Sequence, residues 1–369
     1  MKIVYFTHSL RSCWNHGNAH FVRGVLSELV ARGHEVWAYE PAGAWSLGNL
    51  LKDHGDAALD MFRARYPELS ATEYGPGADI AELVGGADLV IVHEWNAPEL
   101  VAELGHLRAR GAGFRLLFHD THHRAVSAPQ EMKAYDLSGY DGVLAFGATL
   151  ARVYEGWGWG DRVFVWHEAS DTRRFQPPAE EHPREGLVWV GNWGDGERSQ
   201  EIVDYLLEPA QAAGLELDIY GVRYPTEARQ TLQSFGAHYH GWIANAAAPD
   251  VFATHLATVH VPRRFYTQVL PGIPTIRVFE ALACGIPLVS APWDDCEQLF
   301  RVGEDFLMVR DGAEMTRVLR DLKSDLDLRA SLAQRGMETI RARHTCAHRV
   351  DELLTILERL GAPVLESAA

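Results

Sequence analysis

Residues 275–293 read TIRVFEALACGIPLVSAPW, and this stretch decides how the second half of the chain folds. It predicts a helix over 278–283, a break at 284–285 and an apolar strand over 286–290. The start of a helix points free N–H groups and partial positive charge at whatever lies before it, which suits a phosphate. Glu280, expected in the first turn, could accept hydrogen bonds from two neighbouring sugar hydroxyls. On spacing alone, a buried helix–turn–strand with an incidental glutamate fits equally well.

Composition and charge point to a globular protein of two domains. The chain has 369 residues, too many for one ordinary domain, and a hydrophobic fraction of 47% can form two cores. Its net charge is −16, and no segment carries a concentrated basic stripe. This charge pattern argues against a nucleic-acid partner and weakens the case for binding to an anionic membrane.

Cysteine usage and hydropathy favour a cytoplasmic protein without a transmembrane segment. The four cysteines form no C-x-x-C pair, which is typical of a reducing compartment and not of a disulfide framework or a structural zinc site. The N-terminus, MKIVYFTHSL, runs into a strand pattern and lacks a signal-peptide core. No window approaches 18 uncharged apolar residues.

The first half of the chain alternates strands with helices. A strand over 2–6, a helix over 19–31 and a strand over 35–39 form a βαβ unit, which predicts a parallel sheet with right-handed crossovers. Ligands bind at the carboxyl ends of such strands, so the loop over 7–18 should face a ligand. Further strands are expected over 88–92, 114–118, 142–145, 163–166, 187–190, 215–220, 238–242 and 257–261.

Two strand ends in this half carry polar clusters. His93 and Glu94 follow one strand, and the sequence HDTHHR over 119–124 follows another. A metal site is the less favoured interpretation of the second cluster, because it has no i, i+4 histidine pair on a helix and no cysteine nearby. Capping of the strands through bonds to the backbone is the ordinary alternative, and we favour it for His122 and His123.

The second half offers two candidate anion sites. A glycine-rich loop, GNWGDGER over 191–198, lies between a strand and a helix predicted over 200–212. Its amides could approach an anion, although three glycines can also form a plain surface turn. Arg263 and Arg264 follow the strand over 257–261, and in an acidic protein we expect one of them to contact a phosphate or an acceptor.

The sequence EALACGIP over 280–287 resembles the nucleotide-sugar motif of the GT-B glycosyltransferases, especially the retaining enzymes with a Glu-x7-Glu pair. Glu280 matches the second glutamate of that pair, and Gly272 stands at the position of the first. The segments RVFE over 277–280, DLR over 327–329 and HTCAHR over 344–349 resemble more narrowly the CgeB-like spore-maturation glycosyltransferases, near the group 1, family-4-like enzymes. The resemblance covers roughly residues 185–357.

The resemblance implies the GT-B fold, an α/β architecture of two Rossmann-like, doubly wound parallel-sheet domains facing a central cleft. Residues 1–172 would form the acceptor-binding domain, and 173–346 the nucleotide-sugar-binding domain. Residues 347–369 would form a helix that crosses back to the first domain, followed by a tail. The segment over 167–178 resembles the family's interdomain hinge.

The resemblance also implies roles for individual residues. Glu280 would hold the donor ribose, Arg277 and the backbone before it would hold the diphosphate, and His119 would face the donor sugar. Arg198 or Arg223 would supply a further phosphate-binding cation, and the nucleotide base would lie near residues 242–243. The donor-binding candidates are Gly17, Asn18, Asn192, Arg198, Arg223, Trp242, Ile243, Arg263, Arg264, Thr275, Ile276, Arg277 and Glu280. The acceptor-side candidates are His16, His20, His93 and Glu94.

We therefore predict a glycosyltransferase that uses a nucleoside diphosphate sugar, with UDP favoured and GDP as the alternative. The acceptor is a glycan, a protein or a small molecule, and neither a metal nor another cofactor is expected. The resemblance favours retention; an inverting enzyme would need a base such as His16, His20 or His119. Two alternatives are a sugar-nucleotide 2-epimerase, which would act without an acceptor, and a binding protein that kept the ribose site and lost catalysis.

Overall fold

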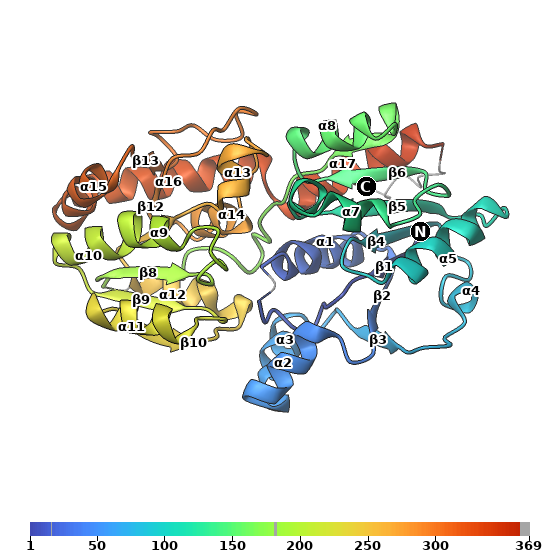
Figure 1. The fold of residues 1–369 in the computed structure, drawn as a ribbon, viewed down its shortest axis with the longest axis horizontal. Helices are drawn as coiled ribbons and strands as arrows, with labels where there is room; N and C mark the ends of the chain where they lie inside the picture. Colours follow the sequence, from blue (N-terminus) through green and yellow to red (C-terminus); the bar gives the residue numbers. More distant parts are fainter. Residues whose placement is uncertain (16, 181–182, 362–369) are drawn as a thin grey trace. The chain divides into compact units, whose positions relative to one another are not determined.

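A computed structural model of the protein describes residues 1–15, 17–180 and 183–361 (Figure 1). The chain forms two compact units. The N-terminal unit comprises Met1–Glu168 and Cys346–Ala369, and the C-terminal unit comprises Ala169–Thr345. The main chain therefore passes between the units twice. Among the described residues, no helix has the length and apolar character needed to cross a bilayer.

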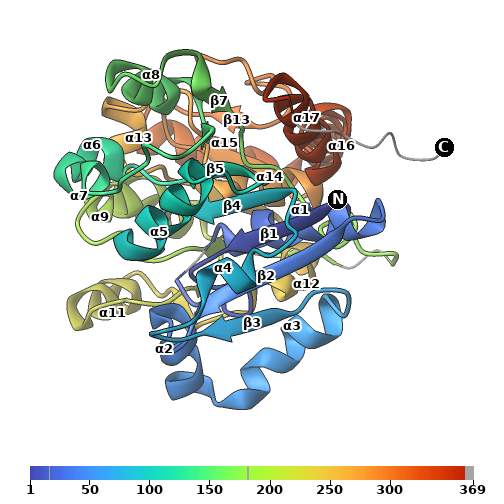
Figure 2. The ribbon, with the colours of Figure 1, turned by 90° about the vertical axis from the view of Figure 1, so that its right-hand side faces the viewer.

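The N-terminal unit contains a parallel sheet with the strand order β3-β2-β1-β4-β5-β6-β7 (Figure 2). The order reverses between β1 and β4, so right-handed crossovers place the helices that follow these two strands on opposite faces of the sheet. The strands are β1 (Lys2–Phe6), β2 (Glu35–Pro41), β3 (Ala71–Tyr74), β4 (Leu89–His93), β5 (Arg115–Asp120), β6 (Gly142–Ala145) and β7 (Val163–Val165). The helices are α1 (Ala19–Ala31), α2 (Trp45–His54), η1 (Asp56–Leu59), α3 (Asp60–Arg65), α4 (Ile80–Leu83), α5 (Pro98–Ala109), α6 (Arg124–Ser127), α7 (Pro129–Lys133), α8 (Ala148–Gly156), η2 (Gly160–Arg162) and α17 (Cys346–Arg359).

Helices on both faces explain why the central strands of this sheet are almost wholly apolar. Residues 89–92 of β4 and 116–118 of β5 have no solvent exposure. The βαβ pattern at the start of the chain is confirmed, since β1 and α1 have the predicted bounds.

The last helix, α17, belongs to the N-terminal unit and packs against α1. The indole of Trp166 donates a hydrogen bond to the carbonyl oxygen of Arg349 at 2.8 Å. Arg349 Nε in turn donates to the carbonyl oxygen of His167 at 2.9 Å. These two bonds join the helix to the segment that leaves β7.

The C-terminal unit contains a second parallel sheet, with the order β10-β9-β8-β11-β12-β13. This order reverses between β8 and β11. The strands are β8 (Leu187–Val190), β9 (Leu217–Tyr220), β10 (His238–Gly241), β11 (Ala257–His260), β12 (Leu288–Ser290) and β13 (Leu307–Met308). The helices are α9 (Ser199–Ile202), η3 (Val203–Leu207), α10 (Glu208–Ala213), α11 (Thr226–Ser234), η4 (Asn245–Ala247), α12 (Ala248–Thr254), α13 (Arg264–Gln268), α14 (Ile276–Ala283), α15 (Gly312–Ser324) and α16 (Leu326–Arg343).

Residues 275–293 differ in detail from their predicted form. Helix α14 begins at Ile276, two residues earlier than predicted, with Thr275 in extended backbone before it. Arg277 therefore lies inside the helix, and Glu280 lies in its second turn and not in its first. Strand β12 begins at Leu288, later than predicted, because Pro287 has no N–H to donate to a neighbouring strand.

Other predicted elements also differ in their bounds. The helix predicted over 200–212 is interrupted by a π-helical segment, η3, between α9 and α10. Strands β3 and β13 were not predicted; both are short edge strands, and only two residues of β13 are paired. A short edge strand carries too little hydrophobic alternation to stand out in the sequence.

A close backbone contact in the N-terminal unit yields a stability prediction. A Cβ atom at Gly139 would lie 2.1 Å from the carbonyl oxygen of Gly105 in α5. Gly139→Ala should therefore lower the free energy of unfolding by about 1–3 kcal/mol, because the backbone must move to admit the methyl group. Gly113→Ala is the matched control, since nothing lies within 4 Å of its Cβ position. Equal melting temperatures for the two variants would contradict this packing.

Candidate functional site

In the C-terminal unit, side chains converge where the strand order reverses. The loop after β8 carries Asn192, and the loop after β11 carries Arg263. Arg198 Nη2 and Arg263 Nη2 donate to Asn192 Oδ1, at 3.2 and 3.0 Å. The carboxyl edge at such a reversal is where open α/β sheets bind ligands. Asn192, Arg198 and Arg263 are thus three donor-binding candidates that the structure brings together.

Arg198 is a buried cation with neutral partners. Its guanidinium donates to the carbonyl oxygens of Val261 at 2.8 Å and Asn192 at 3.0 Å. The guanidinium carbon of Arg198 lies 5.0 Å from the ring centre of Trp189. Burial, followed by the charge of Arg263, lowers the pKa of Arg198 to about 9, which leaves it charged at neutral pH. A buried charge of this kind is costly, and a bound anion would offset the cost.

The other candidate arginines are held by carboxylates. Arg263 Nη1 donates to Glu197 at 2.5 Å, and Arg264 makes two bonds to Glu201 at 2.6 and 2.9 Å. Arg223 pairs with Asp195 at 3.0 Å on the exposed surface. Of these three arginines, Arg263 also bonds to Asn192, whereas the bonds of Arg264 and Arg223 go to other groups.

Glu280 is completely buried, and both of its carboxylate oxygens are occupied. Oε1 accepts a hydrogen bond from Asn245 Nδ2 at 2.6 Å, and Oε2 accepts one from Arg277 Nη1. Burial raises the pKa of Glu280, opposed chiefly by the Arg277 charge. No motif in the sequence marks Asn245, although this amide lies only a few residues beyond β10. The arrangement fixes the orientation of the carboxylate from two sides.

Arg277 connects this carboxylate to the arginine cluster. The positive charge of Arg277, one turn before Glu280, is among those that lower the pKa of Arg198. Thr275 and Ile276 lie at the start of α14, directly before Arg277 in the sequence. Trp242 and Ile243, proposed to lie near the base, follow edge strand β10 and are partly buried.

Gly272, at the position of the missing glutamate, is required by the backbone. Its φ is +89°, and a Cβ atom there would lie 2.7 Å from Cys296 Sγ. The carboxylate of Glu297 is close by, with Oε1 3.3 Å from that Cβ position. Sequence inspection missed Glu297 because a motif of fixed spacing cannot reveal a residue contributed by a later loop.

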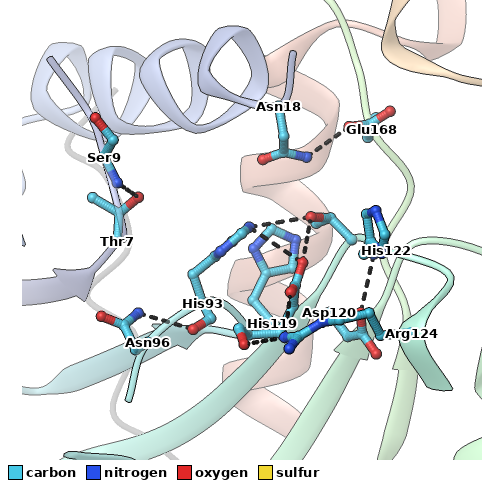
Figure 3. Close-up of polar contacts among 12 residues, drawn as sticks. Thr7, Ser9, Asn18, His93, Asn96, His119, Asp120, His122, Arg124 and Glu168 are labelled. Carbon is cyan, nitrogen blue, oxygen red and sulfur yellow. Dashed lines mark hydrogen bonds and ion pairs between the residues drawn. The ribbon is translucent and has the colours of Figure 1, made fainter. Parts of the chain in front are cut away.

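In the N-terminal unit, the polar residues after β4 and β5 form a buried cluster (Figure 3). Glu94 accepts hydrogen bonds from Arg124 at 2.9 Å and from Thr121 at 3.2 Å. Burial, followed by the charge of Asp120, raises the pKa of Glu94 to about 8. Burial likewise raises the pKa of Asp120 to about 6, although the hydrogen bond that the Tyr154 hydroxyl donates to it lowers this pKa. Burial therefore disfavours the ionised form of both acids, although Asp120, with a pKa of about 6, is still mostly ionised near pH 7.

His119 lies inside β5 and not beyond its end. It is completely buried, its Nδ1 is 2.6 Å from the Tyr5 hydroxyl, and its ring centre is 4.8 Å from that of Trp166. Burial lowers the pKa of His119 to about 3, so the ring is neutral near pH 7. The strand continues to Asp120, two residues beyond the predicted end, which places this histidine among aromatic side chains.

Among the remaining candidates of this unit, His93 and His20 are buried, Asn18 is half-buried and Gly17 is exposed. His93 Nε2 is 3.1 Å from Thr121 Oγ1, and His20 is completely buried in α1. Asn18, which follows Gly17, donates to Glu168 at 2.6 Å (Figure 3). His16 lies outside the described residues. Within the described ranges, no group of three or more histidine, cysteine or acidic side chains has a metal-binding arrangement.

Comparison with known proteins bears on both units. Residues 198–355 match the model of the glycosyl transferase-like family. Anabaena Alr3699/HepE in complex with UDP has 13% identity and a TM-score of 0.69, covering 97% of this chain and 100% of that chain. T4 phage BGT with its UDP-glucose substrate has 13% identity and a TM-score of 0.61, with the same coverage.

A third similar structure is an alpha-glucosyltransferase with UDP and a 13-mer DNA, with 12% identity and a TM-score of 0.67. It covers 97% of this chain and 99% of that chain. No curated protein matches the sequence. The structural matches confirm the predicted GT-B fold, and with the family match they confirm the predicted class of enzyme, a glycosyltransferase.

The buried acid Glu94 predicts a pH effect on stability. An acid whose pKa is higher in the folded than in the unfolded state stabilises the fold at low pH, and this stabilisation is lost as pH rises from about 4.5 towards 8. Glu94→Gln should therefore reduce the difference in melting temperature between pH 5.5 and pH 8. The substitution should reduce the difference in the free energy of unfolding between pH 5.5 and pH 8 by about 1–3 kcal/mol.

Glu131→Gln is the control for this experiment. Glu131 lies 3.8 Å from the same arginine, Arg124, but its side chain is exposed. This variant should keep the wild-type pH dependence. An unchanged pH dependence in Glu94→Gln would show that the buried acid does not titrate over this range.

Proposed function

We propose that the protein transfers a sugar from a UDP-sugar to an acceptor hydroxyl, with retention at the anomeric carbon and without a metal. The observation that carries this proposal is the buried Arg198, whose hydrogen-bonding partners among the described residues are all neutral and which lies beside Arg263 where the strand order reverses. A diphosphate is the anion of a glycosyltransferase donor. UDP is favoured over GDP because the similar Anabaena and T4 phage structures contain UDP or UDP-glucose.

The main electrostatic task is to stabilise the leaving diphosphate. As the bond from the anomeric carbon to the phosphate oxygen breaks, negative charge grows on the UDP. Arg198, Arg263 and Arg277 would offset this charge, helped by the free amides at the start of α14. Arg263 and Arg277 are paired with Glu197 and Glu280, so Arg198 would provide most of the positive charge that a metal would otherwise supply, and we expect no metal requirement.

Glu280 would hold the ribose through its carboxylate. Asn245 and Arg277 fix the orientation of its carboxylate, so that little ordering is needed when the donor binds. In a retaining reaction the leaving phosphate takes the acceptor's proton as the new glycosidic bond forms, and no protein base is required. The buried, neutral state of His119 is compatible with this route, since a base must reach the acceptor hydroxyl.

Glu297 would take the place of the missing glutamate on the donor sugar. Its carboxylate lies against the backbone position where the related motif has its first acid, so a similar group is available from another loop. In this proposal, Glu297 supplies the carboxylate that the related motif has at the position of Gly272. This interpretation favours an active enzyme over a binding protein that has lost catalysis.

Several narrower assignments also belong to this proposal. The sequence segments that resemble CgeB-like enzymes favour that group, and the cysteine usage favours the cytoplasm. A 2-epimerase would convert the donor without an acceptor, whereas a transferase would release UDP faster when its acceptor is added. The N-terminal unit would bind the acceptor, and the C-terminal unit the donor.

The arginine cluster predicts a specific pattern of nucleotide affinity. In calorimetric titrations, wild-type protein should prefer UDP to GDP and dTDP, with or without EDTA. Arg198→Ala should weaken UDP binding by about 10–100-fold, because a charge-assisted hydrogen bond is worth about 1.5–3 kcal/mol. Arg264→Ala is the control and should change the affinity less than about 2-fold, since Glu201 holds that side chain.

Two results would contradict the donor-site assignment. One is wild-type protein that binds none of the three nucleotides although it is folded. The other is an equal loss of affinity in Arg198→Ala and Arg264→Ala. A loss of binding on adding EDTA would overturn only the metal-independent part of the proposal.

Glu297 can be tested separately from nucleotide binding. Glu297→Gln should weaken UDP-glucose binding by about 10-fold and leave the affinity for UDP unchanged, because the carboxylate would contact the sugar alone. Glu304→Gln provides a control acid whose partners are the surface residues Arg301 and Arg335. Equal losses for UDP and UDP-glucose would show that Glu297 does not contact the sugar.

A further inference from the structure

Trp95 presents an exposed indole at the carboxyl edge of the N-terminal sheet. The residue lies two positions after the end of β4, and its exposed fraction is 43%. Strands β1 and β4 are neighbours at the point where the strand order of this sheet reverses. Ligands of open α/β sheets bind at this edge. A large aromatic side chain that stays exposed at such a position is a candidate ligand contact.

The indole is fixed from one side by a buried ionic contact. The Arg124 guanidinium carbon lies 3.9 Å from the ring centre of Trp95. Arg124 is itself held by Glu94, through the carboxylate at 2.9 Å and the carbonyl oxygen at 2.5 Å. The Tyr135 hydroxyl lies 3.3 Å from the same guanidinium nitrogen. The ring is thus held before any ligand arrives, which lowers the entropy lost on binding.

Polar rings border this indole. The ring of His122 meets it edge-on at 5.1 Å between centres, and the ring of His8 does so at 6.3 Å. His8 comes from the loop after β1, on the other side of the reversal point. An apolar face bordered by hydrogen-bonding groups matches a pyranose ring, which has apolar C–H faces and hydroxyls around its edge.

A second fixed indole leaves the same edge of the sheet. Trp45, four residues after β2, is 57% exposed and meets Trp14 edge-on at 5.0 Å between ring centres. Trp14 Nε1 donates to Asp53 at 3.1 Å, and Ser46 Oγ donates to the Trp14 carbonyl oxygen at 2.7 Å. Since β1 lies between β2 and β4, the two indoles leave the sheet on either side of it. An extended ligand fits this arrangement better than a single small ring.

We propose that Trp95 is a stacking platform for a sugar ring of the acceptor, and that the acceptor is a glycan chain that also reaches Trp45. This inference rests on the proposed glycosyltransferase function and specifies its acceptor class. Nucleobases also stack on aromatic side chains, but nucleic-acid binding further requires positive charge along the backbone. The net charge of −16 disfavours such a polyanion. A neutral glycan meets no such repulsion.

The test is binding of the full-length protein to an array of immobilised neutral oligosaccharides, with single-stranded DNA spots alongside, at saturating UDP. Wild-type protein should bind at least one series of oligosaccharides, more strongly with chain length. Trp95→Ala should lose at least 10-fold of this affinity, and Trp95→Phe should restore part of it. Trp37→Ala is the matched control, because Trp37 has the same exposed fraction, 43%, but lies in the first half of β2.

Calorimetric titration of each preparation with UDP separates the two proposals. If UDP binds normally and no oligosaccharide does, or if DNA is bound instead, the glycan acceptor is overturned while the donor site stands. Equal losses of oligosaccharide binding in Trp95→Ala and Trp37→Ala would also overturn the platform. If UDP itself does not bind, the result contradicts the proposed glycosyltransferase function, on which the glycan acceptor depends.

Discussion

A buried guanidinium whose hydrogen bonds, within the described part of the chain, all go to neutral groups is the constraint on which the C-terminal unit depends. Arg198 lies against Trp189 and two carbonyl oxygens, and a second arginine stands beside it. Most buried charges in proteins are paired, because removing a charge from water costs several kcal/mol. Here Glu197 pairs with Arg263 and Glu201 pairs with Arg264. Arg198 is therefore the arginine of this group that is best suited to bind an anion. The loop after β8 is arranged around that charge.

The N-terminal unit uses its charges in the opposite way. Arg124 is held by the Glu94 carboxylate and stacks against the ring of Trp95, so the exposed group here is an indole and not a guanidinium. Parallel sheets with a reversed strand order explain why both arrangements lie at strand ends, since loops that diverge there leave room for side chains. One unit thus offers positive charge at this edge, and the other offers an indole ring.

The general fold could be predicted from the sequence because it depends on local patterns. Apolar runs of four to six residues and a glycine-closed helix predicted β1, α1 and β2 almost residue by residue. The candidate site was less accessible, because its contacts join distant segments. Glu297 beside Gly272 and Asn245 on Glu280 depend on how loops meet, which no spacing reveals. The burial of individual side chains was also not evident from the sequence. His119 was expected at the end of a strand but lies inside β5 among aromatic rings.

The position of α17 has a consequence for the order in which the chain folds. The C-terminal unit is a continuous segment of sequence, whereas the N-terminal unit needs residues from both ends of the chain. During synthesis, the Trp166 indole that donates and the Arg349 carbonyl that accepts this hydrogen bond emerge 183 residues apart. The N-terminal unit must therefore wait, with the surface of α1 that α17 will cover still open, until the C-terminal unit and α17 have been synthesised. The unit made first is the last to be completed.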